Sequence, residues 1–128
     1  MEKLTSTNFA DMAESVILGL IEVDKFGNEK IRLTTSKIRN LLSMTNVLYA
    51  KTRLYKQEEL NDELLKDIQY LKMRFAYEAG REKDVKTFVE QAAIMQHIKS
   101  IDNSRSKLLL FCNYIESLVA YHRFYGGK

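Results

Sequence analysis

The chain has 128 residues, of which 45% are apolar and 29% are charged, and its net charge is +3 at neutral pH. This length and balance are those of one soluble domain with a single core, which we expect to cover residues 1–128. The single cysteine excludes an internal disulfide, and charges interrupt the apolar stretches well before the length of a membrane span. Proline is absent and glycine occurs five times, so little interrupts helices and the composition predicts an all-α fold. The lone cysteine and an N-terminus unlike a signal segment predict a reducing, cytoplasmic setting.

Apolar periodicity predicts two helices in the first half of the chain. Apolar side chains recur at helical spacing over residues 9–21, which predicts a helix that runs to about Val23. Gly27 and Asn28 follow within a stretch of mixed polarity and predict a loop. A second helix is expected over about 35–56, with a hydroxyl side chain as its cap.

Three further helices are expected in the second half, which completes a single compact bundle of about five. Acidic residues gather over 58–67, where they favour the positive end of a helix expected over about 61–79. Another helix should span about 84–100. The last, over about 108–125, is apolar on nearly every side, so we expect it at the centre of the bundle.

The charges are strongly segregated along the chain. Residues 30–57 carry seven basic side chains and no acidic one, whereas 1–29 carry two basic and six acidic, and 58–70 carry one and five. A run without acids forgoes the i, i+4 pairing of Glu with Lys, and its like charges repel. An anionic partner is therefore indicated, and nucleic acid is the commonest one.

Within the helix over 35–56, the basic residues fall on two flanks of an inward apolar stripe. Arg39 and Arg53 lie on one flank, and Lys37 and Lys51 lie on the other. Each pair is separated by about 21 Å at 1.5 Å per residue, long enough to follow several consecutive phosphates. A further basic excess lies at 71–86. The candidate contacts are Lys37, Arg39, Lys51, Arg53, Lys56, Arg74 and Arg81.

Other anionic partners give alternative interpretations. A membrane-binding helix should expose large apolar residues beside its lysines, whereas here the periodicity assigns the apolar residues to the core, so we expect no membrane contact. The remaining alternative is a purely structural bundle whose basic face docks an acidic protein surface and never touches RNA.

The candidate catalytic residues lack catalytic spacing. Cys112 and His122 would lie about 80° and nearly three turns apart on one helix, too far for a thiolate and its base. Glu90 and His97 share a helix face but lie two turns apart, unlike a metal-binding pair. The acids over 58–67 are explained by capping and the helix dipole. We therefore predict a protein that is not an enzyme and uses no metal or cofactor.

Three stretches in order carry a family resemblance: LTTSKIRNLLSMTN at 33–46, YLKMRFAYEAGRE at 70–82 and FCNYIESLVAYHRFYGGK at 111–128. They resemble the small helical subunit of type III-A CRISPR effector complexes, the Csm family. The resemblance covers about residues 30–128, and residues 1–29 are less distinctive.

The resemblance implies a five-helix bundle that stacks in several copies along the inside of the complex, in antiviral defence. Its implied partners are copies of itself, the backbone subunits that hold the guide RNA, and the large subunit. It implies contacts to the backbones of guide and target RNA without catalysis, since RNA cleavage is assigned to the backbone subunit. Cleavage of single-stranded DNA and synthesis of cyclic oligoadenylate are assigned to the large subunit. Consistent with this role, no RRM-type aromatic motif or GXXG loop occurs, and we assign most Tyr and Phe residues to the core.

Overall fold

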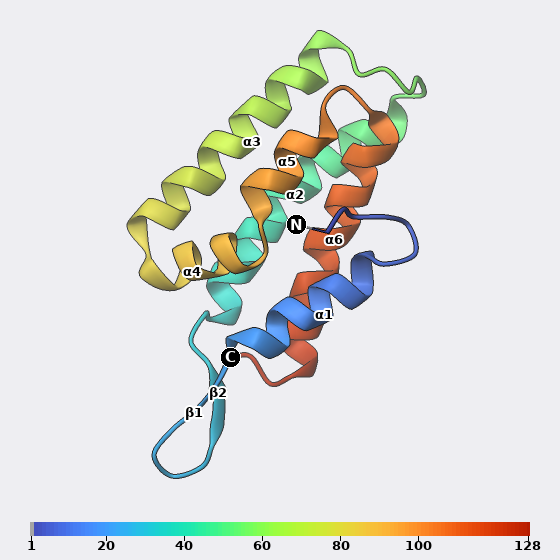
Figure 1. Ribbon diagram of the computed structural model, residues 1–128. Helices are drawn as coiled ribbons and strands as arrows, with labels where there is room; N and C mark the ends of the chain where they lie inside the picture. Colours follow the sequence, from blue (N-terminus) through green and yellow to red (C-terminus); the bar gives the residue numbers. More distant parts are fainter. Residues whose placement is uncertain (1) are drawn as a thin grey trace.

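The computed structural model describes residues 2–128, and in this part of the chain six helices surround one core while a short hairpin projects from one end (Figure 1). The predicted all-α bundle is thereby confirmed. In chain order the elements are α1 (Phe9–Leu20), β1 (Ile21–Val23), β2 (Glu29–Ile31), α2 (Thr35–Leu54), α3 (Asp62–Arg81), α4 (Lys83–Gln91), α5 (Ile94–Ile101) and α6 (Arg105–Phe124).

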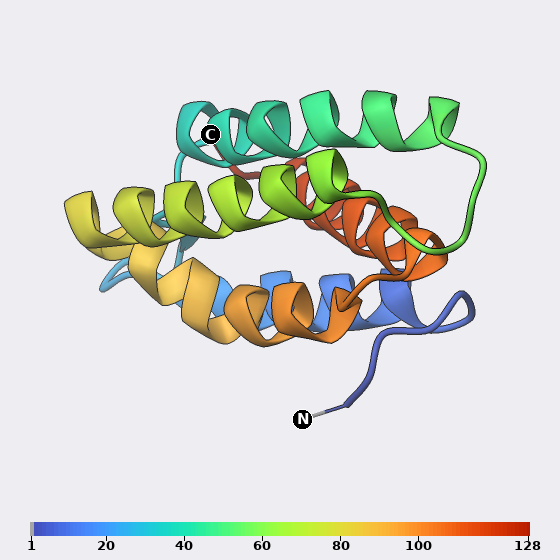
Figure 2. The same ribbon diagram turned by 90° about the horizontal axis from the view of Figure 1, so that it is seen from above.

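Helix α6 is the central element, as its apolar sequence predicts. It lies between α2 and α1, while α3, α4 and α5 close the other side of the core (Figure 2). Its buried side chains come from several faces of the helix and include Leu118, which has no exposed surface. None of the helices in the described part of the chain is both long and apolar enough to cross a membrane.

The helix predicted over 84–100 is divided, which raises the helix count from the expected five to six. Ala93 takes a left-handed conformation with φ of 53° and separates α4 from α5. The buried Tyr114 hydroxyl donates a hydrogen bond of 2.8 Å to the carbonyl of Ala92 at this break. Alanine is the best helix former, so the local sequence gives no sign of this turn. The turn is instead accompanied by the hydrogen bond from Tyr114 of α6.

The segment between α1 and α2 is a hairpin and not only a loop. Ile21 pairs with Ile31 in antiparallel register, so α1 ends at Leu20 and the predicted extension to Val23 is wrong. The predicted loop is confirmed at the tip, where Gly27 has φ of 82°. There the Asp24 carboxylate accepts hydrogen bonds from two backbone N–H groups of the turn, which lower its pKa.

Side-chain caps begin the three long helices. Thr34, Asn61 and Ser104 each accept a hydrogen bond from the backbone N–H three residues along, at 3.3, 2.9 and 3.2 Å. Thr34 provides the hydroxyl cap that the sequence predicts for α2. Because each cap satisfies a donor that the first helical turn leaves unpaired, these residues fix where α2, α3 and α6 start.

Two charged side chains join the end of α2 to the start of α6. The Arg105 Nε donates to the carbonyl of Thr52 at 3.2 Å and also to that of Tyr55, so it caps the C-terminus of α2. The Glu58 carboxylate accepts from the backbone N–H of Ser106 at 3.1 Å and from the hydroxyls of two serines, which lowers its pKa. These contacts join the C-terminal end of α2 and the residues after it to the start of α6.

Candidate nucleic-acid interface

Helix α2 has the register that its sequence predicts. Its fully buried residues form the inward stripe, and the two threonines in that stripe donate their hydroxyls to backbone carbonyls one turn earlier, at 3.1 and 2.7 Å. The buried set is Ile38, Leu41, Thr45, Leu48 and Thr52. The basic residues therefore occupy two flanks, as expected.

The lysine flank, Lys37 and Lys51, faces acids from α3 and from the residue that joins α3 to α4. Lys37 Nζ lies 3.2 Å from a carboxylate oxygen of Glu82. Lys51 Nζ lies 2.8 Å from Asp67 and 3.3 Å from Glu63, and the hydrogen bonds to these two carboxylates raise its pKa. Residues 30–57 contain no acid, but the fold brings acids from elsewhere in the chain next to this run. The two lysines are therefore already paired with carboxylates of the same protein.

The arginine flank, Arg39 and Arg53, is exposed to solvent. Within residues 2–128, neither guanidinium has a carboxylate within 4 Å. The Arg53 guanidinium lies over the ring of Tyr49, 5.8 Å from its centroid. Beyond the helix end, Lys56 Nζ donates to the carbonyl of Arg53 at 3.1 Å and adds a third cation there. The structure thus distinguishes two flanks that are equivalent in sequence.

Arg74 and Arg81, the remaining predicted contacts, lie on α3 and not on the arginine flank. Arg81 pairs with Glu78 at 3.4 Å and lies over the ring of Tyr77, 5.6 Å from its centroid. Arg74 is partly buried between α2 and α3. The predicted contact set is therefore spread over more than one surface.

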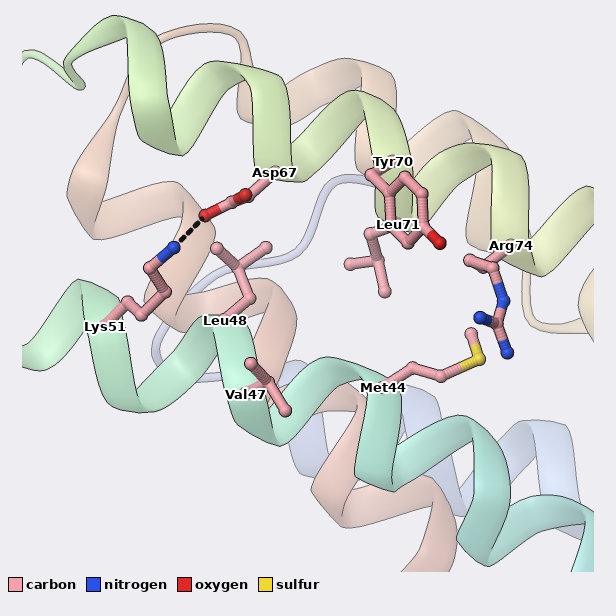
Figure 3. Close-up of a pocket in the computed structure, with 8 residues that line it drawn as sticks. All are labelled: Met44, Val47, Leu48, Lys51, Asp67, Tyr70, Leu71 and Arg74. Atoms are coloured by element: carbon pink, nitrogen blue, oxygen red, sulfur yellow. Dashed lines mark hydrogen bonds and ion pairs between the residues drawn. The ribbon is translucent and has the colours of Figure 1, made fainter.

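A groove between α2 and α3 is a feature that the sequence analysis missed. It is an open cavity of about 230 Å³. In Figure 3, Lys51 and Asp67 lie at one end of it and Arg74 lies at the other. Val47 and Tyr70, on opposite walls, are 68% and 57% exposed. The lining residues are Met44, Val47, Leu48, Lys51, Asp67, Tyr70, Leu71 and Arg74. Nearby on α3, Met73 and Tyr77 are also exposed.

A signal for this groove exists in the sequence. Tyr70, Met73 and Tyr77 recur at helical spacing on α3, on a face different from that of the buried Leu71 and Phe75. A helix that is apolar on two faces has either two buried sides or an exposed apolar face. The prediction that most aromatic residues lie in the core therefore missed the exposed apolar face of α3.

The nucleophile and base candidates are built into the core. Burial raises the pKa of the Cys112 thiol to about 12, so it is protonated at neutral pH. A ring nitrogen of His122 lies 2.7 Å from the carbonyl of Leu33. His97 packs edge-on against Tyr114, and burial lowers its pKa. Over residues 2–128, no three His, Cys, Asp or Glu side chains gather as a metal site would require.

The chain is similar to known proteins over most or all of its length. Residues 20–128, which include every predicted contact residue, match the family model described as Csm2 Type III-A. A "CRISPR system Cms protein Csm2" of Streptococcus thermophilus is 46% identical over 128 residues, which cover 100% of this chain and 99% of that protein. A protein of the same name from Mycobacterium tuberculosis is 41% identical over 96 residues, 75% of this chain and 77% of the relative. One from Enterococcus italicus is 40% identical over 95 residues, covering 73% and 68%.

Proposed function

Because the chain belongs to the Csm2 family, the small subunit of the type III-A CRISPR Csm effector complex, we propose that its arginine flank binds the backbone of guide or target RNA. The observation that carries this proposal is the contrast between the flanks. Lys37 and Lys51 pair with carboxylates of the fold, whereas Arg39 and Arg53 are exposed and, among the described residues, without an acidic partner. Unpaired exposed arginines keep their full charge for an external anion.

The chemistry of the arginine flank suits phosphates and does not suit base reading. A guanidinium presents several donors in one plane and binds phosphate oxygens bidentately. Arg39 and Arg53 are separated by about 21 Å along the helix, so they would contact phosphates several nucleotides apart. Contacts of this kind position a strand and carry no sequence information. A subunit that must accept any guide sequence needs this property.

The proposed role is structural support of RNA without catalysis. In this role several copies of the subunit stack along the inner face of the complex, beside the backbone and large subunits. The buried, protonated Cys112 and the buried His122 support a non-catalytic role because neither side chain is accessible to a substrate. Cleavage then belongs to other subunits of the complex.

A second candidate is docking of the arginine flank on an acidic surface of another protein, without RNA contact. The same exposed charges support it, since arginines are also common at protein interfaces. The two candidates differ in what the flank recognises, and RNA binding distinguishes them directly.

The test is the salt dependence of RNA binding. Single-stranded RNA of unrelated sequences is titrated into the purified chain and into the assembled complex at several salt concentrations. We expect affinity to fall steeply with salt, with a slope of roughly 0.7 in log K per log salt for each phosphate engaged, and equally for each sequence. If the purified chain does not bind RNA, and the complex binds RNA with the same affinity with and without this subunit, the docking candidate is correct.

A further inference from the structure

The α2–α3 groove presents aromatic and apolar surface next to an arginine, outside the arginine flank. Its walls are Val47 and Leu48 from α2 and Tyr70 and Leu71 from α3, and more than half of the Tyr70 side chain is exposed. In Figure 3 the Tyr70 ring lies along the upper wall, above an open space that faces Val47 and Leu48. Apolar side chains line its middle, and charged groups lie at its ends.

The two ends of the groove differ in charge balance. At one end, Lys51 and Asp67 neutralise each other through an ion pair of 2.8 Å. At the other end, the Arg74 side chain reaches from α3 toward the sulfur of Met44 (Figure 3). Among residues 2–128, no carboxylate pairs with Arg74, and its Nε is buried without a hydrogen-bond acceptor. The groove end at Arg74 therefore carries a positive charge that no carboxylate of residues 2–128 balances.

We propose that the groove binds one unpaired base of an RNA strand, which stacks on Tyr70 and accepts a hydrogen bond from Arg74. This inference rests on the proposed RNA-binding function and adds a contact to a base. A base has flat apolar faces for the walls and carbonyl or ring-nitrogen acceptors along its edge for the guanidinium. Single-stranded RNA is commonly held in this way, with bases stacked on aromatic rings beside arginines.

An apolar side chain from a partner protein fits the same groove less well. It would cover Tyr70 and Val47 but would leave the charged guanidinium of Arg74 without a hydrogen-bond acceptor or an opposite charge. A base covers the apolar walls and also offers acceptors to the guanidinium. Because every base has a flat face, stacking on Tyr70 does not depend on the RNA sequence. Contacts of the arginine flank to phosphates do not depend on it either.

The first measurement compares Tyr70→Ala with Tyr70→Phe in the full chain. Binding of fluorescein-labelled single-stranded RNA is measured by anisotropy at several salt concentrations. Stacking of one base on an aromatic ring corresponds to a loss of about 5- to 150-fold in affinity on removal of the ring. We expect Tyr70→Ala to weaken binding by at least about fivefold with an unchanged salt slope, because no phosphate contact is lost, and Tyr70→Phe to bind like the wild type.

The second measurement locates the base. RNA containing 5-iodouridine is irradiated in complex with the chain, and cross-linked peptides are identified by mass spectrometry. Tyr70 lies in the tryptic peptide DIQYLK, residues 67–72, and is its only aromatic residue. We expect a cross-link to this peptide that Tyr70→Ala abolishes.

Three results would overturn the inference. RNA affinity of Tyr70→Ala equal to that of the wild type, with no cross-link at residues 67–72, would show that the groove holds no base. Loss of assembly with other subunits, with RNA affinity of the chain intact, would assign the groove to a protein partner. Equal losses in Tyr70→Ala and Tyr70→Phe would exclude stacking. In each case Arg39→Gln with Arg53→Gln remains a separate test of the arginine flank, so failure of the base site and failure of RNA binding are distinguishable.

Discussion

At the scale of single residues, the Cys112 thiol shows how burial sets reactivity. Its pKa is raised to about 12 because desolvation disfavours the thiolate. Since the thiolate is the reactive form, we expect iodoacetamide at mildly alkaline pH to leave the native protein unmodified and to alkylate it fully in guanidinium chloride. Mass spectrometry at timed intervals measures this, and equal rates in the two solutions would show that Cys112 is not buried.

Gly127 is a second residue whose role depends on close packing. Its N–H donates to the carbonyl of His122 at 2.8 Å, and its carbonyl accepts from the hydroxyl of Thr35. A Cβ at this position would overlap ring atoms of His122, whereas a Cβ at Gly80 on α3 would meet nothing within 4 Å. We expect Gly127→Ala to lower the free energy of unfolding by about 1–3 kcal/mol as an overpacking change.

Gly80→Ala is the matched control for that change. It should leave the free energy of unfolding at the wild-type value or raise it by up to about 1 kcal/mol, since alanine is a better helix former than glycine. Both variants can be compared by urea denaturation. The same stability for both would contradict the close packing of the C-terminal segment on His122.

At the scale of elements, α6 organises the core. Leu118 has no exposed surface and lies in the middle of this helix. We expect Leu118→Ala to lower the free energy of unfolding by about 2–5 kcal/mol through lost burial and a residual cavity. Val47→Ala on the exposed wall of the groove, 68% exposed, should change it by less than about 0.5 kcal/mol. Similar effects of the two changes would mean that α6 is not central.

The helices that the sequence predicts well are those whose own periodicity determines them. Helix α2 has the predicted span and inward stripe because its apolar spacing and its Thr34 cap are local signals. The break at Ala93 and the hairpin at 21–31 were missed for a different reason. The break accompanies a hydrogen bond from Tyr114, 22 residues away, and strands of three residues are stable only through each other.

The candidate site divides in the same way. Charge counting located the basic run of α2, and helical geometry separated its two flanks. The sequence could not show which flank is neutralised, because Glu82 and Asp67 contact Lys37 and Lys51 from 45 and 16 residues away. It also could not place Arg74 in a groove that two helices form together. Contacts between two elements could therefore not be predicted, whereas the inward stripe and the flanks of α2 could.

At the scale of the whole molecule, the family and the buried nucleophile candidates lead to a prediction about activity. We expect the purified chain to leave single-stranded RNA intact over long incubations, with the same result after addition of Mg²⁺ or of EDTA. Cleavage would be followed by denaturing gel electrophoresis. Nuclease activity that stays with the folded protein through successive purification steps, and that a surface variant alters, would contradict a non-catalytic role.

The central claim is that the arginine flank contacts RNA while the lysine flank serves the fold. Two double variants test it with equal changes of net charge: Arg39→Gln with Arg53→Gln, and Lys37→Gln with Lys51→Gln. Glutamine is preferable to glutamate because glutamate on the lysine flank would face Glu82 and Asp67.

The deciding measurement is the salt dependence of target-RNA affinity for the assembled complex carrying each double variant, with two unrelated guides. We predict that the arginine variant binds more weakly with both guides and has a shallower salt slope, while the lysine variant keeps the wild-type slope and loses only stability. Equal slopes for the wild type and the arginine variant in complexes that assemble normally would contradict the account, as would a shallower slope in the lysine variant alone.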